Sequence, residues 1–573
     1  MELAVCGRGP AVDAIVAAAG DIDSAVRRVE PRALAASGRT LPTVGAVVAP
    51  TGAAVFRAAT DRFERWVAVE IGGLGGYPIE SIDAAVTTFG PETACYRCLT
   101  TRVGAHESAS EDDPHGDRSR VRLAGAVAGN RLVSLLAGTA EGGTITELPG
   151  ADRQLLAVAG CDCDPAATPS RSLSLTHRSV EIDAALARAE KAVDDRVGLV
   201  TNVGERESFP APYYIADIAE TTGLSDTAAA DLAAGVDADW DRAYMKAIGE
   251  ALERYSAGVY RRQTATRGSE RTLSAPVSPA AFVRPDGFVD PEPDQQLAWV
   301  EGRSLPDNEP VSLPAEFVWF PPPTQRFRPA ITTGLGLGNS SIEAMLAGLY
   351  EVIERDATML AWYSTFEPLG LVIEADEGID ELTKRARAES LSVSLVLVTQ
   401  DIDVPVVAAA VHRDGEWPRF AVGSAADLAV TAAARSALAE ALQNWMELRA
   451  MGPATAAEQG GAIAEYADRP PAAEAFVDPD SRIPADELGA AELTGAAALS
   501  AVCERLAAVD LDAYAARLTT RGVDALGFEA VRVVVPAAQP LFTGEPYFGE
   551  RARSVPRSMG FEPRLDRSYH PYP

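Results

Sequence analysis

Lysine is nearly absent from this chain. Only three of its 51 basic residues are lysines, at Lys191, Lys246 and Lys384, and the others are arginines. Acidic residues number 82, so the formal net charge is −31. Because affinity for phosphate backbones comes from stripes of Lys and Arg, we expect no nucleic-acid partner. The charge is typical of a solvated acidic surface, and the shortage of lysine fits either a high-salt cytoplasm with an acidic proteome or a GC-rich genome.

Long apolar runs are also lacking. No stretch reaches the ~18 apolar residues that a membrane-spanning helix needs. The first residues, MELAVCGRGPAV, lack a basic segment followed by an apolar one, as a signal peptide would have. We therefore expect a cytoplasmic protein with no membrane partner. Its 573 residues are too many for one ordinary core, so two or three domains are expected.

Cysteine is scarce, but its placement is informative. Of the six cysteines, Cys6 and Cys503 stand alone, and we expect them to be buried apolar residues. The other four form two close pairs, in CYRC and CDC. Two loops that each present two thiolates can close a tetrahedral zinc site without a catalytic role; the alternative is four reduced, unconnected thiols. The predicted zinc ligands are Cys95, Cys98, Cys161 and Cys163.

The first hundred residues alternate short apolar runs with Ala-rich helical stretches, which predicts an α/β unit. The GRGP that follows the first strand lacks the third glycine of a dinucleotide-binding turn. We find no winged-helix pattern in residues 1–90, so the binding of a leader peptide there is not expected. Strands are predicted at 1–7, 43–50 and 65–73, and helices at 10–20 and 53–63.

Polar and Pro/Gly-rich segments divide the rest of the chain. Residues 105–120 are predicted to form an exposed loop, and 164–175 a linker. Between them, 131–163 predict a helix, a hairpin and the second cysteine pair. The remaining ~400 residues suit two related α/β halves better than one core. The Ala-, Glu- and Pro-rich segment 452–500 is expected to be a helical insertion.

Carboxylates are aligned on two predicted helices. In GNSSIEAMLAGLYEVIERDA (338–357), Glu343, Glu351 and Glu354 fall on one face of an otherwise apolar helix. In DRAYMKAIGEALERYSAG (241–258), Glu250 and Glu253 share a face, with cations nearby that also allow a solvated charged surface. Buried carboxylates are costly unless counter-charges satisfy them, whereas Mg²⁺ on a nucleotide uses such ligands. The Gly-rich turn TTGLGLGNSS, which precedes the longer helix, suits close approach of a phosphate.

These stretches resemble the YcaO superfamily. The resemblance rests on KAIGEALERY (246–255), GLGLGNSSIEAMLAGLYEVIERDA (334–357), AARSALAEALQ (433–443) and the final HPYP. It implies an enzyme that uses ATP and Mg²⁺ to phosphorylate a peptide-backbone amide oxygen during azoline or thioamide formation. The third motif often ends in Gln-x-Arg, but here Gln443 is followed two residues later by Trp445 instead of arginine. Arg435 or Arg449 would have to take the place of the missing arginine. The implied cofactor-binding residues are Glu250, Glu253, Asn339, Glu343, Glu351, Glu354, Glu440 and Gln443.

The N-terminal part is similar, through ACYRCLTTRV (94–103), to the docking domain that accompanies azoline-forming YcaO enzymes. The predicted fold class is α/β (α+β), with a docking-like domain at 1–165 and a YcaO domain at 166–573. The resemblance also implies a proline-rich tail that reaches the active site near Glu250 and Glu343. Its residues would act in catalysis, with His570 orienting the substrate or moving a proton near neutral pH. The tail residues in question are His570, Pro571 and Pro573.

The expected reaction is cyclodehydration, which makes a thiazoline or oxazoline from Cys, Ser or Thr of a peptide or protein substrate. Two alternatives stay open: thioamide formation with a sulfur-delivery partner, and a non-catalytic scaffold that binds ATP or a peptide. A dehydrogenase partner and a homodimer are further expectations of the resemblance. The expected cofactors are ATP and Mg²⁺, with structural Zn²⁺ at the cysteines.

Overall fold

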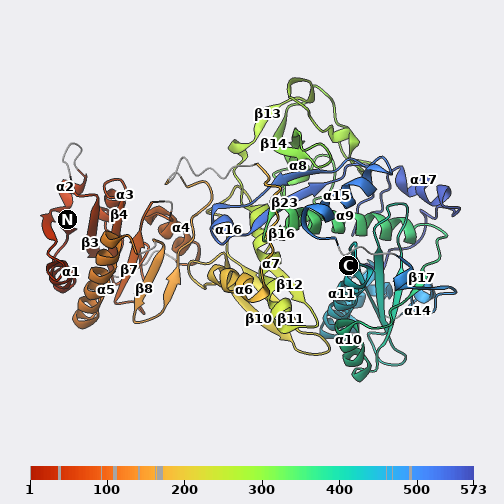
Figure 1. Cartoon of the computed structure of the whole chain (residues 1–573), viewed down its shortest axis with the longest axis horizontal. Coiled ribbons are helices and arrows are strands. Elements are labelled where there is room, and N and C mark those ends of the chain that lie inside the picture. Colours follow the sequence, from red (N-terminus) through yellow and green to blue (C-terminus); the bar gives the residue numbers. More distant parts are fainter. Residues whose placement is uncertain are drawn as a thin grey trace.

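The computed structural model describes residues 2–35, 41–91, 93–107, 113–139, 142–161, 163, 172–459, 461–466, 469–488 and 493–572. Figure 1 shows a smaller N-terminal part, coloured red to orange, that lies beside a larger part holding the rest of the chain. Helices and strands alternate in both parts, with parallel and antiparallel pairing, so the predicted α/β (α+β) class is confirmed.

A seven-stranded sheet forms the centre of the smaller part, in the order β2–β1–β3–β4–β7–β8–β9. The pairs from β2 to β4 are parallel, and those from β4 to β9 are antiparallel. Parallel neighbours need crossover connections, which α1 (Pro10–Gly20) and α3 (Val55–Thr60) help to supply. The strands are β1 (Glu2–Cys6), β2 (Ala25–Val29), β3 (Val44–Pro50), β4 (Arg65–Ile71), β7 (Ala84–Phe89), β8 (Thr144–Leu148) and β9 (Asp152–Gln154).

Helices α1 (Pro10–Gly20) and α5 (Arg118–Ala137) share an apolar cluster with one face of this sheet. They lie close together because Gly125 faces Ala11, whose carbonyl oxygen would be 2.3 Å from any Cβ at that position. The side chain of Asp117 caps α5 by accepting from two backbone amides of its first turn. The helix and hairpin expected at 131–163 are thus confirmed as the end of α5 followed by β8 and β9.

The predicted strands and helices of the first hundred residues are all present as β1, β3, β4, α1 and α3 (Val55–Thr60). Sequence reasoning missed the edge strand β2, whose AVRRV is mostly exposed and lacks an apolar run. The loop predicted at 105–120 overlaps the ends of two helices. Helix α4 (Tyr96–His106) extends to His106, and α5 already begins at Arg118. The predicted linker 164–175 lies mainly outside the described residues, and its described end, 172–175, has no regular structure.

The larger part contains three further sheets. One has the order β10–β11–β12, a second β13–β14–β22–β23–β16 with β15 beside β14, and a third β20–β19–β18–β17–β21. Their strands are β10 (Val200–Glu207), β11 (Tyr213–Ile218), β12 (Leu232–Val236), β13 (Thr266–Gly268), β14 (Leu297–Ser304), β15 (Pro310–Pro314), β16 (Leu335–Gly338), β17 (Leu369–Val372), β18 (Ser392–Leu397), β19 (Val406–His412), β20 (Phe420–Ala426), β21 (Arg482–Pro484), β22 (Tyr514–Arg517) and β23 (Glu529–Val534).

The segment 452–500 is only partly the helical insertion that its composition predicts. Helices α12 (Pro453–Gln459), α13 (Gly461–Tyr466) and α14 (Glu474–Val477) are present. However, β21 adds a parallel strand to the edge of the third sheet beside β17. RIP is too short to give a strand signal by itself, and pairing with an existing edge supplies the hydrogen bonds.

A hydrophobic cluster joins the two parts of the molecule. It includes Phe56 and Tyr96 of the smaller part together with Leu199, Leu252 and Val523 of the larger part. The last strand of the seven-stranded sheet ends at Gln154, but the hydrophobic cluster continues without a break from the smaller part into the larger part. The boundary between residues 165 and 166 therefore stays a prediction from the sequence.

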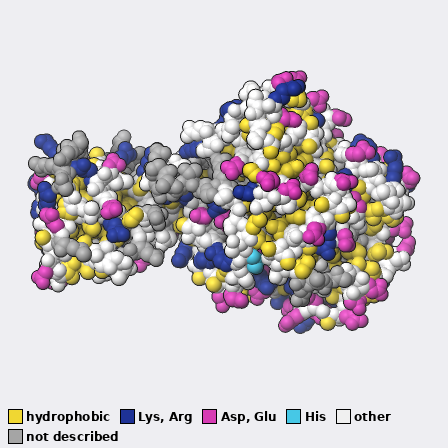
Figure 2. Space-filling view, turned by 45° about the horizontal axis from the view of Figure 1, so that its top comes forward, with side chains coloured by type: hydrophobic (Ala, Val, Ile, Leu, Met, Phe, Trp, Pro, Cys, Tyr) yellow, Lys and Arg dark blue, Asp and Glu magenta, His cyan; other side chains and the backbone are white. Residues whose placement is uncertain are grey.

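The isolated cysteines Cys6 and Cys503 are both buried, as expected, and burial raises the pKa of each thiol to about 11. No helix among the described residues is long and apolar enough to span a bilayer. Figure 2 shows Asp and Glu side chains scattered over the visible face of the larger part. That distribution agrees with a solvated acidic surface.

Candidate functional site

Three helices carry the predicted carboxylates: α7 (Trp240–Gly258), α9 (Ser341–Trp362) and α11 (Val430–Met451). Each helix lies against a strand at a glycine, where a Cβ atom would come within 2.1 to 2.4 Å of the helix backbone. Only glycine permits that approach, so these positions set the distance between helix and strand. The glycines are Gly235 in β12, Gly336 in β16 and Gly423 in β20.

Close packing brings a backbone amide to one glutamate of each helix. In all three places an N–H group at or beside the strand donates to the carboxylate, which favours its ionised form and fixes its direction. The three bonds are Ala234 N–H to Glu250 (2.9 Å), Gly334 N–H to Glu351 (2.9 Å) and Ser424 N–H to Glu440 (2.8 Å).

Five glutamates interact electrostatically, with Glu351 in common. Burial raises the pKa of the other four, and the charge of Glu351 raises it further in each case. The pKa of Glu253 rises from 4.5 to about 8, through burial and then Glu351 and Glu250. Burial also raises the pKa of Glu354 to about 8, although Ser424 Oγ donates to it at 2.6 Å. Glu250 and Glu440 complete the set.

Three arginines lie among these carboxylates, none of which sequence reasoning assigned to the site. Arg254 Nη2 is 2.8 Å from Glu250, and Arg355 Nη1 is 3.6 Å from Glu354. Arg532 is buried, and its pKa falls to about 9 because burial outweighs the attraction of Glu351 and Glu253. Arg355 had a signal: it directly follows Glu354 on a buried helix.

Arg355 is the most telling of the missed residues. It interacts electrostatically with Glu354, Glu440 and Glu351, yet its Nη1 has no hydrogen-bond partner among the described residues. A buried guanidinium with an unused donor is costly unless an acceptor completes it. A phosphate oxygen is the kind of acceptor that such a group binds.

Glu343 lies toward the other end of α9 from Glu354. It sits in the first turn of α9, about 16 Å along the helix axis from Glu354. Its Oε2 accepts from the backbone N–H (2.8 Å) and Nδ2 (3.1 Å) of Asn339. Arg178 donates to the Asn339 carbonyl oxygen, and Arg188 donates to its side chain. The predicted site is therefore one elongated region along α9 rather than one point.

The third motif is divided between the site and the core. Gln443 donates to Glu447 (2.9 Å), which interacts with Glu250, so Gln443 lies at the rim. Trp445 is fully buried, and its Nε1 donates to the Pro418 carbonyl oxygen (3.1 Å).

Neither arginine that was expected to compensate for Trp445 lies in the carboxylate cluster. Arg435 pairs with Asp376 (2.5 Å), and Arg449 pairs with Glu389 (3.3 Å) while stacking on Trp445. That expectation is wrong because both guanidinium groups are held by other partners. Arg355 is the arginine that the structure places beside Glu354.

The C-terminal tail packs against the larger part of the molecule, at the end of α9. Trp362 Nε1 donates to the Ser568 carbonyl oxygen (3.1 Å). Tyr572 is buried, and burial and then the charge of Glu354 raise its pKa. The tail thus reaches the Glu354 end of α9. The expected position was near Glu250 and Glu343, and of these two only Glu250 belongs to the carboxylate cluster that includes Glu354. Pro573 lies outside the described residues.

His570 does not titrate near neutrality, contrary to the prediction. Its Nε2 lies 2.6 Å from the Phe542 carbonyl oxygen and must carry the proton of that hydrogen bond. Burial lowers the pKa of His570 to about 4. The imidazole is therefore neutral at pH 7. The next residue in the tail, Pro571, is partly buried. These contacts make His570 a residue that holds the tail in place.

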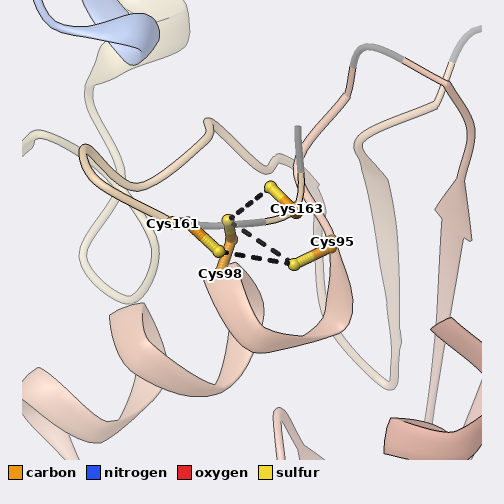
Figure 3. Close-up of side chains that lie close together, drawn as sticks. All are labelled: Cys95, Cys98, Cys161 and Cys163. Atoms are coloured by element: carbon orange, nitrogen blue, oxygen red, sulfur yellow. Dashed lines mark hydrogen bonds between the residues drawn. The ribbon is translucent and has the colours of Figure 1, made fainter. Parts of the chain in front are cut away.

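The four paired cysteines converge on one point, as Figure 3 shows. Their sulfur atoms all lie within 4.8 Å of one another, with separations of 3.7 Å for Cys95–Cys161, 3.8 Å for Cys95–Cys98 and 3.9 Å for Cys98–Cys163. A tetrahedron with Zn–S bonds of 2.3 Å has edges of about 3.8 Å. The quartet therefore fits a tetrahedral metal.

The structure also anchors the first cysteine pair to the sheet. Tyr96, between the two cysteines, donates to the buried carboxylate of Glu70 (2.8 Å). That carboxylate also accepts from Thr51 Oγ1 and from the backbone amides of Gly75 and Gly76, at 2.8 to 2.9 Å. Burial nevertheless raises the pKa of Glu70. These bonds fix the start of α4 and with it the direction of both thiols.

The carboxylate cluster could bind a divalent cation, but with a wider spacing of ligands than the cysteine quartet. Among the described residues, the cysteine quartet is the only group of three or more ligands within 4.8 Å of one another, so the carboxylates stand farther apart. Burial and the charge of Glu351 raise the pKa of the other four carboxyl groups, so a cation bound between them would favour their ionised forms. Mg²⁺ bound with phosphate oxygens and water between such carboxylates is the ordinary arrangement.

Comparison with known proteins identifies the family. Residues 234–539 match the model described as YcaO cyclodehydratase, ATP- and Mg²⁺-binding. An uncharacterized protein of Methanothermobacter thermautotrophicus is 32% identical over 222 residues, covering 35% of this chain and 55% of that protein. The chain thus spans about half the length of this curated relative. The match to the family model covers more than half of the chain, so the chain belongs to the YcaO family.

Solved structures match the fold over most of the chain. A heterocyclase in complex with substrate and cofactor is 18% identical, with a TM-score of 0.70 over 99% of this chain and 84% of that one. The heterocyclase TruD is 17% identical, with a TM-score of 0.65 over 98% and 82%. The YcaO protein of Methanopyrus kandleri bound with AMPPCP and Mg²⁺ is 22% identical, with a TM-score of 0.52 over 65% and 98%. The chain thus shares the fold of these two heterocyclases over nearly its whole length.

Proposed function

We propose that this protein is a single-chain, ATP-dependent cyclodehydratase that converts Cys, Ser or Thr residues of a peptide into azolines. The observation that carries the proposal is the cluster of five buried or half-buried glutamates on α7, α9 and α11, all of which interact through Glu351. Three of them, Glu351, Glu354 and Glu440, also interact with Arg355. Carboxylates that converge from three helices, together with an unused guanidinium donor, suit Mg²⁺ with a polyphosphate. Membership of a family described as ATP- and Mg²⁺-binding supports the same interpretation.

In this proposal each residue has a defined task. The glutamates Glu250, Glu253, Glu351, Glu354 and Glu440 hold Mg²⁺, which neutralises phosphate charge when bound. Arg355 binds a phosphate oxygen from within the cluster. Asn339 and Glu343 bind the nucleotide at the other end of the region, and Gln443 acts at its rim. No side chain of the protein becomes a nucleophile, so catalysis rests on positioning and charge stabilisation.

The chemical sequence uses the substrate's own groups. A side-chain thiol or hydroxyl adds to the preceding backbone carbonyl carbon, and the amide oxygen becomes a poor leaving group. ATP then transfers its γ-phosphoryl group to that oxygen, and departure of phosphate with loss of the amide proton leaves the C=N bond of the azoline. A cavity of about 520 Å³, lined in part by Trp362, Phe366, Phe476 and Arg567, lies beside the tail and is large enough for a short peptide segment.

The product mass of a modified peptide tests this proposal. Purified protein is incubated with Mg²⁺, ATP and candidate peptides that contain Cys, Ser or Thr. Cyclodehydration removes one water per ring, whereas thioamide formation with a sulfur donor replaces one oxygen by sulfur. A scaffold would bind nucleotide or peptide but change neither mass. Nucleotide hydrolysis that is independent of every such peptide, with no mass change, would argue against the enzyme.

The tail offers a second test. Deletion of residues 569–573 is expected to abolish peptide modification while nucleotide affinity changes less than about threefold, since the described part of the tail meets the site at its Glu354 end. His570→Gln serves as the control because it keeps a side-chain donor for the Phe542 carbonyl oxygen. Calorimetry and mass spectrometry measure the two effects. Normal modification by the truncated chain would remove the tail from the mechanism.

The arrangement of the chain suggests partners and domains. We propose that residues 1–165 act as the docking-like domain and 166–573 as the YcaO domain, with Zn²⁺ at the four cysteines. A dehydrogenase that oxidises azolines, or a sulfur-delivery partner in the thioamide alternative, would dock from outside the chain. Sedimentation of the purified protein tests the proposed homodimer.

A further inference from the structure

The cysteine quartet contacts more than the N-terminal part. Arg521 Nη1 donates to Cys163 Sγ at 3.2 Å. Arg521 begins the short helix α16 (Arg521–Ala525), which lies inside the region matched by the YcaO family model. A second donor, the backbone N–H of Val158, lies 3.4 Å from Cys98 Sγ. The thiols therefore accept hydrogen bonds from both parts of the molecule.

The chain around these donors is closely packed. A Cβ on Gly522 would lie 3.4 Å from the Ala157 carbonyl oxygen, so α16 rests directly on the segment that leads to Cys161. Arg102 of α4 is buried and donates to the carbonyl oxygens of Leu156 (2.7 Å), Ala157 (3.1 Å) and Gly198 (3.3 Å). One guanidinium thus joins the helix of the first cysteine pair, the segment of the second pair and the larger part.

The same packing reaches α7. Val523 of α16 belongs to one hydrophobic cluster with Ala247, Ile248, Ala251 and Leu252 of α7. These residues occupy one face of the helix, and Glu250 and Glu253, which carry the proposed Mg²⁺ ligands, lie on the remaining surface. Both α16 and α7 pack against β23, so a shift of the segment 155–161 that displaces α16 would be transmitted through this shared core to the buried face of α7.

We propose that Arg521 is a positioning residue that couples the metal-bound cysteine quartet to α7 through its hydrogen bond to Cys163. Four thiolates around Zn²⁺ carry two net negative charges, and a charged donor to one sulfur stabilises that charge and directs the ligand. The metal would then hold Cys161 and Cys163 beside α16, and α16 packs on β23, which also packs on α7. The inference rests on the proposed zinc site.

Release of zinc is the first test. The holoprotein with Arg521→Ala is expected to transfer zinc to a colorimetric chelator at least about tenfold faster than the unchanged protein, with Arg521→Lys between them. Arg261→Ala is the matched control, since Arg261 lies near the same loop but pairs with Asp226 (3.1 Å). With Co²⁺ in place of zinc, the sulfur-to-cobalt absorption bands should shift in Arg521→Ala and not in the control.

Hydrogen exchange of α7 is the second test. Zinc removal should speed exchange of Met245–Ser256 in the unchanged protein, and zinc-loaded Arg521→Ala should show part of the same increase. Arg521→Lys should restore most of the protection if the variant with alanine is too unstable to interpret. Zinc-bearing protein in which neither variant alters metal release, cobalt spectrum or α7 exchange would overturn the coupling alone. Purified protein without zinc would overturn both the metal site and the coupling.

Discussion

The cysteine quartet and the glutamate cluster are both sets of metal-ligand side chains, but they are assembled differently. The four sulfurs already lie at the spacing of a tetrahedral metal site. The five carboxylates are spread over three helices and held apart by amide donors and arginines. The first arrangement suits a metal that stays and supports the fold. The second suits a cation that arrives and leaves with a phosphate-bearing ligand.

Loss of one thiol should have the largest effect in this comparison. Cys95→Ser is expected to eliminate the zinc, about one ion per chain, and to lower the melting temperature by more than about 5 °C, because structural zinc binding contributes directly to folding. Metal analysis and calorimetry measure both. Cys503→Ala is the control, since Cys503 is a buried thiol remote from the quartet. Full metal content and unchanged melting in Cys95→Ser would contradict the site.

Loss of one carboxylate should leave the fold intact and weaken nucleotide binding. Glu351→Gln removes the charge shared by the cluster, so Mg²⁺–ATP affinity should fall at least about tenfold. Glu354→Gln and Glu343→Gln should weaken binding as well. Without ligand, Glu354→Gln should melt no lower than the unchanged protein, because the carboxylate it replaces is buried and repelled.

Titration calorimetry gives the affinities of these variants. Glu381→Gln is a suitable control, since Glu381 lies on α10 (Glu377–Ala388) and pairs with Arg385 (2.8 Å). Unchanged affinity in both Glu351→Gln and Glu354→Gln would refute the role of the cluster. A fall in Glu343→Gln alone would place the nucleotide at the first turn of α9.

The pH dependence of binding follows from the raised carboxyl pKa values. Burial and Glu351 raise the pKa of Glu253 from 4.5 to about 8, and burial does the same for Glu354. Between these values the free folded protein holds protons that the unfolded chain releases, so its stability should fall as pH rises from about 5 to 8. Mg²⁺ favours the ionised carboxylates, so Mg²⁺–ATP affinity should rise over the same range with proton release.

Calorimetry in two buffers of different ionisation heat measures the released protons. Glu354→Gln should release fewer than the unchanged protein because one titrating group is gone. The cysteine quartet, which lies outside the carboxylate cluster, should show no matching proton release on addition of nucleotide. An affinity that stays constant between pH 6 and pH 8 would contradict the assignment of these carboxylates to the cation.

The smallest effect should come from Arg449, which the sequence motif made a candidate. Arg449 pairs with Glu389 (3.3 Å) and stacks on Trp445, away from the carboxylate cluster. Arg449→Gln should therefore change nucleotide affinity less than about threefold and the melting temperature by about 1 to 3 °C, as partly exposed ion pairs contribute little. Arg355→Gln is the contrasting variant and should weaken nucleotide binding at least about tenfold. Equal losses of nucleotide affinity in Arg449→Gln and Arg355→Gln would contradict the different roles assigned to these two arginines.

The amino-acid sequence by itself determined the short-range features of this protein. Short apolar runs predicted β1, β3 and β4. The close spacing of the cysteines in CYRC and in CDC predicted that these two short segments each supply a pair of thiols. The aligned Glu351 and Glu354 followed from helix periodicity, since positions three residues apart share a face. These features depend on neighbours in the chain, so local pattern is sufficient to find them.

The tertiary structure decided what depends on distant neighbours. It brought Glu250, Glu354 and Glu440 together through close helix–strand contacts at three glycines, and it separated Glu343 from them. It also turned Trp445 into the core and put Arg355 among the carboxylates. Burial moved His570 away from its ordinary pKa, because desolvation depends on everything packed around a side chain.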